Sequence, residues 1–155
     1  MRGSQKKRCQ LRNASSTGGL HLLARRQVSA LPLTAERQAN VLISYYTSID
    51  ALVGGYADAS HVDTIVYALN ISRLLAMRHL GEEYIEQISE AQLAIIRCQE
   101  RYQTAGKYGL DGPGLVAIKA ISVLHEAQIE MASQAELQAA IVEMHRLLGL
   151  EAVRA

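Results

Sequence analysis

A glycine-rich stretch near the middle of the chain is the first candidate for chemistry. Residues 102–115 read YQTAGKYGLDGPGL and hold four of the chain's eleven glycines. Backbone amides of such loops can cradle phosphate, but a P-loop needs glycine at position 101 and serine or threonine at position 108. Arg101 and Tyr108 stand there instead. A P-loop is therefore excluded.

Two interpretations of this stretch remain. In the first, Gly106, Lys107 and Gly112 hold an anion beside a helix N-terminus. In the second, Gly106 ends one helix in the left-handed conformation and Asp111 or Gly112 caps the next helix. We favour the second interpretation, because every glycine then has a local conformational role.

His125 and Gln128 are polar residues on an otherwise apolar helical arc. At 100° per residue, His125 shares this arc with Ile118, Ile121, Ile129 and Ala132. We expect His125 to be mostly buried, to have a hydrogen-bonding partner within the protein and to open into no large pocket. The alternative is a general base or a ligand-binding group.

Metal and catalytic motifs fail at particular positions. His125-Glu126 would need a second histidine at position 129 for HExxH, where Ile129 stands. Glu143 and His145 lie two residues apart, whereas helical di-iron sites use Glu-x-x-His. We predict no metal, no cofactor and no catalytic residue.

The elements that position these residues are predicted to be helices. Apolar periodicity, caps and glycine stops predict helices over residues 35–53, 60–80, 82–104, 113–132 and 133–148. Ser60 with Asp63, and Ser133 with Glu136, read as capping boxes. The second and fourth helices are apolar around most of their circumference, so we expect both to be central. The polar arc of the fourth is narrow: Lys119, Ser122, Glu126 and Glu130.

These elements predict an all-α fold, a compact bundle of about five helices with antiparallel neighbours. The expected organisation is a basic arm at 1–33, a bundle domain at 34–150 and a tail at 151–155. The 155 residues include no Phe or Trp, and the two cysteines, Cys9 and Cys98, are far apart. The apolar runs are too short to span a membrane. We expect a cytoplasmic protein that does not enter membranes.

Charge is distributed unevenly along the chain. Residues 1–33 hold seven basic residues and no acidic ones, whereas residues 34–155 hold nine basic and fifteen acidic residues. The arm could be a nucleic-acid contact, an organelle transit segment or a solvated leader. We expect residues before about Leu20 not to fold alone. The nucleic-acid contacts would be Lys6, Lys7, Arg8, Arg12, Arg25 and Arg26.

Three strings carry a resemblance that covers roughly Leu33–Leu148: ALNISRLL, RYQTAGKYGLDGPG and LHEAQ. In these the chain resembles short, uncharacterised helical proteins of bacterial plasmids and phages. The resemblance implies a bacterial accessory protein of a mobile element and brings no activity and no site residues.

Our leading hypothesis for function is a non-enzymatic interaction or regulatory protein that binds a protein partner or itself. Tyr46 and Val142 lie at the edges of their helices' apolar stripes, which suggests an additional contact surface. The first alternative is nucleic-acid binding through the arm. The second is a small-molecule binder or enzyme around His125.

Overall fold

A computed structural model describes residues 30–149, and the basic residues of the arm lie outside this range. The described chain contains five α-helices and one short 3-10 helix, with no strand in this range. The elements are α2 (Ala35–Gly54), α3 (Ala59–Ala76), η1 (Glu82–Tyr84), α4 (Ile85–Ala105), α5 (Gly112–Met131) and α6 (Gln134–Leu147). The all-α, five-helix prediction is confirmed.

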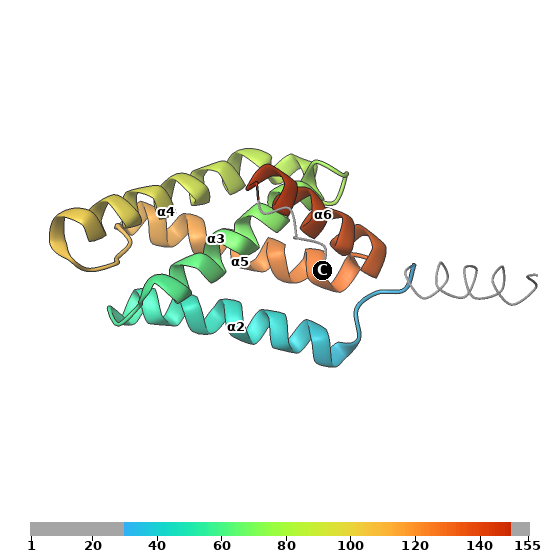
Figure 1. Ribbon diagram of the computed structural model, residues 1–155, viewed down its shortest axis with the longest axis horizontal. Coiled ribbons are helices and arrows are strands. Elements are labelled where there is room, and N and C mark those ends of the chain that lie inside the picture. The colour runs from blue at the N-terminus through green and yellow to red at the C-terminus, as the bar shows by residue number, and fades with distance from the viewer. Residues whose placement is uncertain (1–29, 150–155) are drawn as a thin grey trace, which may run out of the picture.

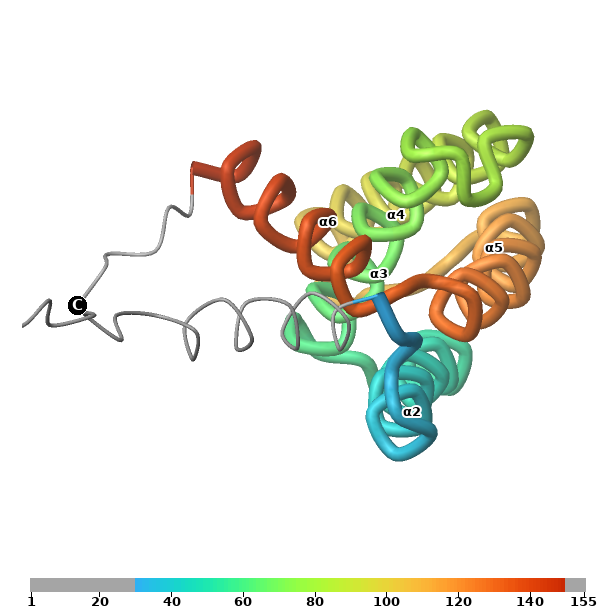
Figure 2. The backbone as a smooth tube through the Cα atoms, turned by 90° about the vertical axis from the view of Figure 1, so that its right-hand side faces the viewer, coloured from blue at the N-terminus to red at the C-terminus, as the bar shows by residue number. Residues whose placement is uncertain are grey.

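Helix α3 is the centre of the bundle and packs against each of the other four α-helices. It crosses the molecule diagonally between α4 and α2 in Figure 1. In Figure 2, α4, α5 and α2 lie around three sides of α3, and α6 lies on the remaining side. The main core lies among α2, α3, α4 and α5, and a second cluster joins the end of α3 to α6. The expectation that the second helix is central is thus correct.

The segment before α2 is attached to the start of α6. The Gln134 backbone amide donates to the Leu31 carbonyl at 2.8 Å, and Pro32 forms an isolated bridge with Ser133. Ser133 also caps α6 in the predicted capping box with Glu136. These bonds fix the chain before α2 against the first turn of α6.

The start of α3 differs from the prediction. Asp58, not Ser60, is the N-cap, and its carboxylate accepts from the amides of Ser60 and His61. The His61 ring completes the capping box by accepting from the Asp58 amide at 3.2 Å. The Asp58 carboxylate accepts from two amides of the first turn and places a negative charge at the positive end of the helix dipole, so the helix starts there.

The exposed side of α5 also differs from the prediction. Ser122 is buried, because its hydroxyl donates to the Lys119 carbonyl at 2.7 Å and needs no water. Lys119 and Glu130 are exposed as predicted, but beside them lies an exposed apolar strip, which we call the α5 face: Val116, Ala120, Val123, Ala127 and Met131. Only one side of helix α5 therefore faces the core of the bundle.

The glycine-rich stretch forms the corner between α4 and α5. Gly106 has φ of +67°, and its amide donates to the Tyr102 carbonyl at 2.8 Å, which confirms the left-handed cap. The Asp111 carboxylate accepts from the Gly114 amide and so caps α5. A Cβ on Gly114 would lie 3.1 Å from the Ala94 Cβ, so glycine is needed there for the close approach of α5 to α4.

Replacing Gly106 with alanine is expected to lower the free energy of unfolding by about 1 kcal/mol, because only glycine adopts this φ without strain. Gly109→Ala is the matched control, since its φ lies outside the left-handed region and its added Cβ would lie 3.8 Å from its nearest neighbour. The control should change the stability by less than about 0.5 kcal/mol. Urea unfolding of both variants measures the difference, and equal stabilities would contradict a conformational role for Gly106.

Within residues 30–149 no helix is both long enough and apolar enough to cross a membrane.

Candidate functional site

Four buried polar residues meet between α2, α3 and α5, and we call them the polar cluster: Tyr45, Ser72, His125 and Gln128. His125 and Gln128 are both 2% exposed, so the predicted burial of His125 is confirmed. They lie one helical turn apart on α5, and both reach toward Ser72 on α3. The cluster thus joins the two helices through their buried sides.

Ser72 contacts α5 through two different groups. Its hydroxyl oxygen lies 2.8 Å from His125 Nδ1, and its carbonyl accepts from Gln128 Nε2 at 3.0 Å. The predicted hydrogen-bonding partner of His125 is therefore Ser72. Sequence reasoning did not single out Ser72, although a serine on the apolar side of a central helix is a usable signal.

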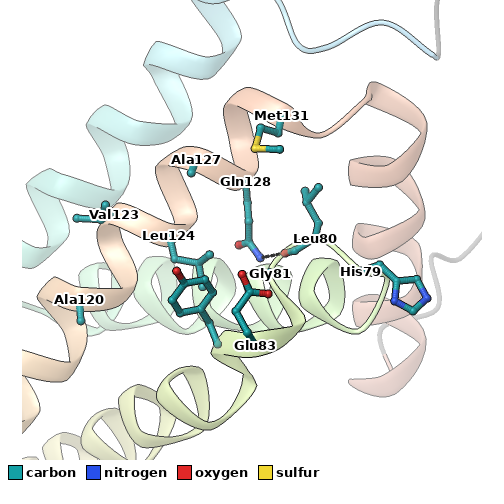
Figure 3. Close-up of a pocket in the computed structure, with 11 residues that line it drawn as sticks. His79, Leu80, Gly81, Glu83, Ala120, Val123, Leu124, Ala127, Gln128 and Met131 are labelled. Atoms are coloured by element: carbon teal, nitrogen blue, oxygen red, sulfur yellow. Dashed lines mark hydrogen bonds between the residues drawn. The ribbon is translucent and has the colours of Figure 1, made fainter.

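Gln128 also holds the connection that follows α3. Its second amide proton is donated to the Leu80 carbonyl at 2.7 Å, drawn as the dashed line in Figure 3. Both amide protons are therefore used, whereas Oε1 is buried without a protein partner. Gly81 lies beneath this amide with φ of +93°, and a Cβ there would lie 3.0 Å from Leu124.

His125 is neutral near pH 7, because burial lowers its pKa to about 4. A neutral imidazole has one donor and one acceptor nitrogen, and Nδ1 faces Ser72. The other nitrogen, Nε2, is buried without a partner in either tautomer. An unused hydrogen-bonding group therefore remains on the far side of the ring.

Tyr45 has a second unused group beside His125. The two ring centroids are 5.0 Å apart, and the Tyr45 hydroxyl is buried without a partner. Burial raises the pKa of Tyr45, so the hydroxyl keeps its proton. Helical periodicity can indicate that the Tyr45 ring is buried, but it does not indicate the role of the hydroxyl.

A pocket of about 250 Å³ lies beside these two rings, and we call it the His125 pocket. Residues of α2, α3, α5 and α6 line it, including Val41, Ile71, Ile129 and Ile141. The expectation that His125 opens into no large pocket agrees with this volume. The pocket exists, but its volume lies below the 300–1,000 Å³ of drug-sized sites.

A second hollow, the α5 groove, has a volume of about 350 Å³. It lies between α5 and the connection that contains Leu80, Gly81 and Glu83, as Figure 3 shows. Ala120, Val123 and Met131 of the α5 face line it together with Gln128. Gln128 is therefore the one member of the polar cluster that also lines the α5 groove.

The polar cluster does not have the features of a hydrolytic site. Ser72 and His125 are in contact, but Ser72 is 0% exposed and lines neither hollow, so a substrate could not reach its hydroxyl. Within the part of the chain that the structure describes, no three His, Cys, Asp or Glu side chains gather as metal ligands. The contacts instead hold α3, α5 and the Leu80 connection together.

The other candidate residues do not join this site. Gly106, Lys107 and Gly112 lie at the corner near the start of α5, about 20 Å from His125 along the helix at 1.5 Å per residue. There the Asp111 carboxylate occupies the N-terminus of α5 and pairs with Arg97 at 3.2 Å. These contacts favour the structural interpretation, and the anion site stays a prediction. The nucleic-acid candidates Lys6, Lys7, Arg8, Arg12, Arg25 and Arg26 lie outside the described residues.

Comparison of the chain with protein-family models, with curated proteins and with solved structures finds no match.

Proposed function

We propose that this protein is a non-enzymatic interaction module that self-associates through the α5 face. The observation that carries the proposal is the exposure of large apolar side chains along one side of α5. Val116 and Val123 are each 69% exposed, and Met131 is 70% exposed. A contiguous apolar strip of this kind marks a contact surface more often than a solvated one.

The spacing along the α5 face is that of a helix-pairing seam. Val116, Ala120, Val123 and Ala127 follow one another at intervals of four, three and four residues. This is the a and d pattern of a heptad, which buries one side of a helix against a second helix. The seam is short, so it suits the pairing of two folded bundles better than a free coiled coil.

A second copy of the chain is a suitable occupant, because an antiparallel pairing matches the residues. With Ala120 opposite Val123 of the other copy, Val116 lies opposite Ala127, so each layer combines a large residue with a small one. A two-fold axis repeats both contacts, as an isologous interface requires. Lys119, on one flank of the seam, then approaches Glu126 of the other copy. The pairing thus sets large residues against small ones and places one cation near one carboxylate.

Val123→Glu is expected to weaken self-association by about 100-fold or more, because two buried valines are lost and two carboxylates approach the two-fold axis. Val142→Glu is the matched control, since Val142 is an exposed valine on α6. Sedimentation velocity from about 5 to 200 µM measures the dimer fraction of the full chain and both variants. A monomeric wild-type chain throughout this range would overturn the proposal, as would equal weakening by both substitutions. A stronger effect of the control would place the contact on α6.

Nucleic-acid binding through the arm stays a prediction. Residues 30–149 hold fourteen acidic and eight basic residues, so this part of the chain repels a polyanion overall. Arg97 pairs with Asp111, and Arg101 donates to the Gly109 carbonyl at 3.2 Å. No observation on the described bundle adds support to this alternative.

A further inference from the structure

The His125 pocket contains a concentration of unsatisfied polar groups. Three buried side-chain polar atoms within residues 30–149 have no protein partner: Tyr45 Oη, His125 Nε2 and Gln128 Oε1. Two of the three belong to residues that line this one pocket. An unpaired buried polar atom lowers stability, so such atoms are uncommon in folded proteins.

The walls of the pocket determine the charge of a suitable ligand. No Asp, Glu, Lys or Arg side chain lines it, and the remaining lining is mainly aliphatic. Tyr45 and His125 are both uncharged near pH 7, since burial disfavours the ionised form of each. An ion entering this pocket would lose its hydration without gaining a counter-charge. The pocket therefore favours neutral molecules.

The opening of the pocket lies between α2 and α3. Val41 and Tyr67 are partly exposed at 39% and 42%, whereas Tyr45, His125 and Ile129 are buried below them. Tyr45 and His125 thus belong to the buried side of the pocket, whereas Ser44, Thr64 and Tyr67 add hydroxyl groups among the aliphatic side chains nearer the solvent.

We propose that the His125 pocket binds a small, neutral, mainly apolar molecule that carries one hydroxyl or carbonyl oxygen, which hydrogen-bonds to Tyr45 and His125. An apolar cavity of about 150 Å³ accommodates benzene, so about 250 Å³ suits a substituted single ring or a short branched chain. Tyr45 can donate to the ligand oxygen in either case. His125 Nε2 donates to a carbonyl, or donates to or accepts from a hydroxyl, according to its tautomer.

This inference is independent of self-association. His125 and Ile129 face inward from α5, whereas Val123 faces outward on the opposite side of the same helix. The α5 face can therefore fail as an interface while the pocket binds its ligand, and the reverse also holds. Substitutions of Tyr45 on α2 test the pocket alone.

The test uses three probes of similar size on the full chain: p-cresol, toluene and benzoate. Isothermal titration calorimetry should show binding of p-cresol, roughly 2- to 12-fold weaker binding of toluene, which lacks the hydroxyl, and no binding of benzoate. Ordered water filling the pocket would instead leave all three probes unbound. No p-cresol binding up to about 5 mM overturns the proposal, and so does benzoate binding as strongly as p-cresol.

The Tyr45→Phe variant tests whether the probes bind in the His125 pocket. It should remove most of the preference for p-cresol over toluene while toluene affinity stays the same, because only the hydroxyl is lost. The variant should fold, since the deleted hydroxyl has no partner in the protein. Tyr46→Phe is the matched control: its hydroxyl donates to Glu126 at 2.6 Å outside the pocket, so probe affinity should not change. If neither Tyr45→Phe nor His125→Asn alters p-cresol affinity, the probe binds elsewhere and the proposal fails.

Discussion

Replacing Gln128 with glutamate is expected to lower the free energy of unfolding at pH 7 by about 3–5 kcal/mol. The side chains have almost the same shape, so the change is electronic. In the native protein Gln128 Nε2 donates to the carbonyls of Ser72 and Leu80 at 3.0 and 2.7 Å. A carboxylate would place a buried negative charge against two carbonyl oxygens and leave both without this donor.

Urea unfolding of Gln128→Glu has a matched control in Gln99→Glu, since Gln99 is exposed on α4. The control should change the stability by less than about 0.5 kcal/mol. Protonation of the new carboxyl group restores one donor, so the difference between Gln128→Glu and the wild type should narrow as the pH falls from 7 to 5. A loss below about 1 kcal/mol at pH 7 would show that the two hydrogen bonds contribute little to stability.

Acid is expected to destabilise the native protein by about 3 kcal/mol through His125. Burial lowers the pKa of this histidine from 6.5 to about 4, so between these values the unfolded chain binds more protons than the folded one. Stability should therefore fall as the pH decreases from about 6.5 to about 4. The groups that contact the ring are Ser72 from α3 and Tyr45 from α2, and neither ionises in this range.

The His125→Asn variant distinguishes the loss of stability caused by His125 from that caused by other titrating groups. The shorter amide can replace Nδ1 in the contact with Ser72 but cannot be protonated in this range. The pKa of Asp58 falls to about 2 through bonds from Ser60 and His61, so its stabilisation is lost only below about pH 4. Hydrogen bonds also lower the pKa of Glu136 and Glu143, and their contribution at the acid end of the range is common to the wild type and the variant. Urea unfolding at pH 7, 6, 5 and 4.5 should give a flatter profile for the variant. Parallel profiles would show that His125 becomes protonated without unfolding.

Local signals in the sequence were sufficient for the helices and the corner. Caps, stops and periodicity act within about one helical turn, so the capping box of Ser133 and Glu136 and the left-handed Gly106 could be predicted from neighbouring residues. The same reasoning failed at the start of α3, because two acceptors compete there and Asp58 is the stronger. Burial of His125 was predicted from the large aliphatic residues that share its arc, including Ile118, Ile121 and Ile129.

The candidate site could not be predicted from local patterns, because it forms through contacts between distant segments. Ser72 and His125 are 53 residues apart, and the His125 pocket needs four helices to close around it, so no local pattern indicates either. The sequence likewise did not determine which side of α5 remains exposed. Ser122 satisfies its hydroxyl within its own helix and can be buried, whereas Val116 and Val123 are exposed because α2, α3 and α4 all pack on the other side. A helix's own sequence establishes which sides could be buried, but only the placement of its neighbours decides which side is, because burial is a property of the surface that two elements share.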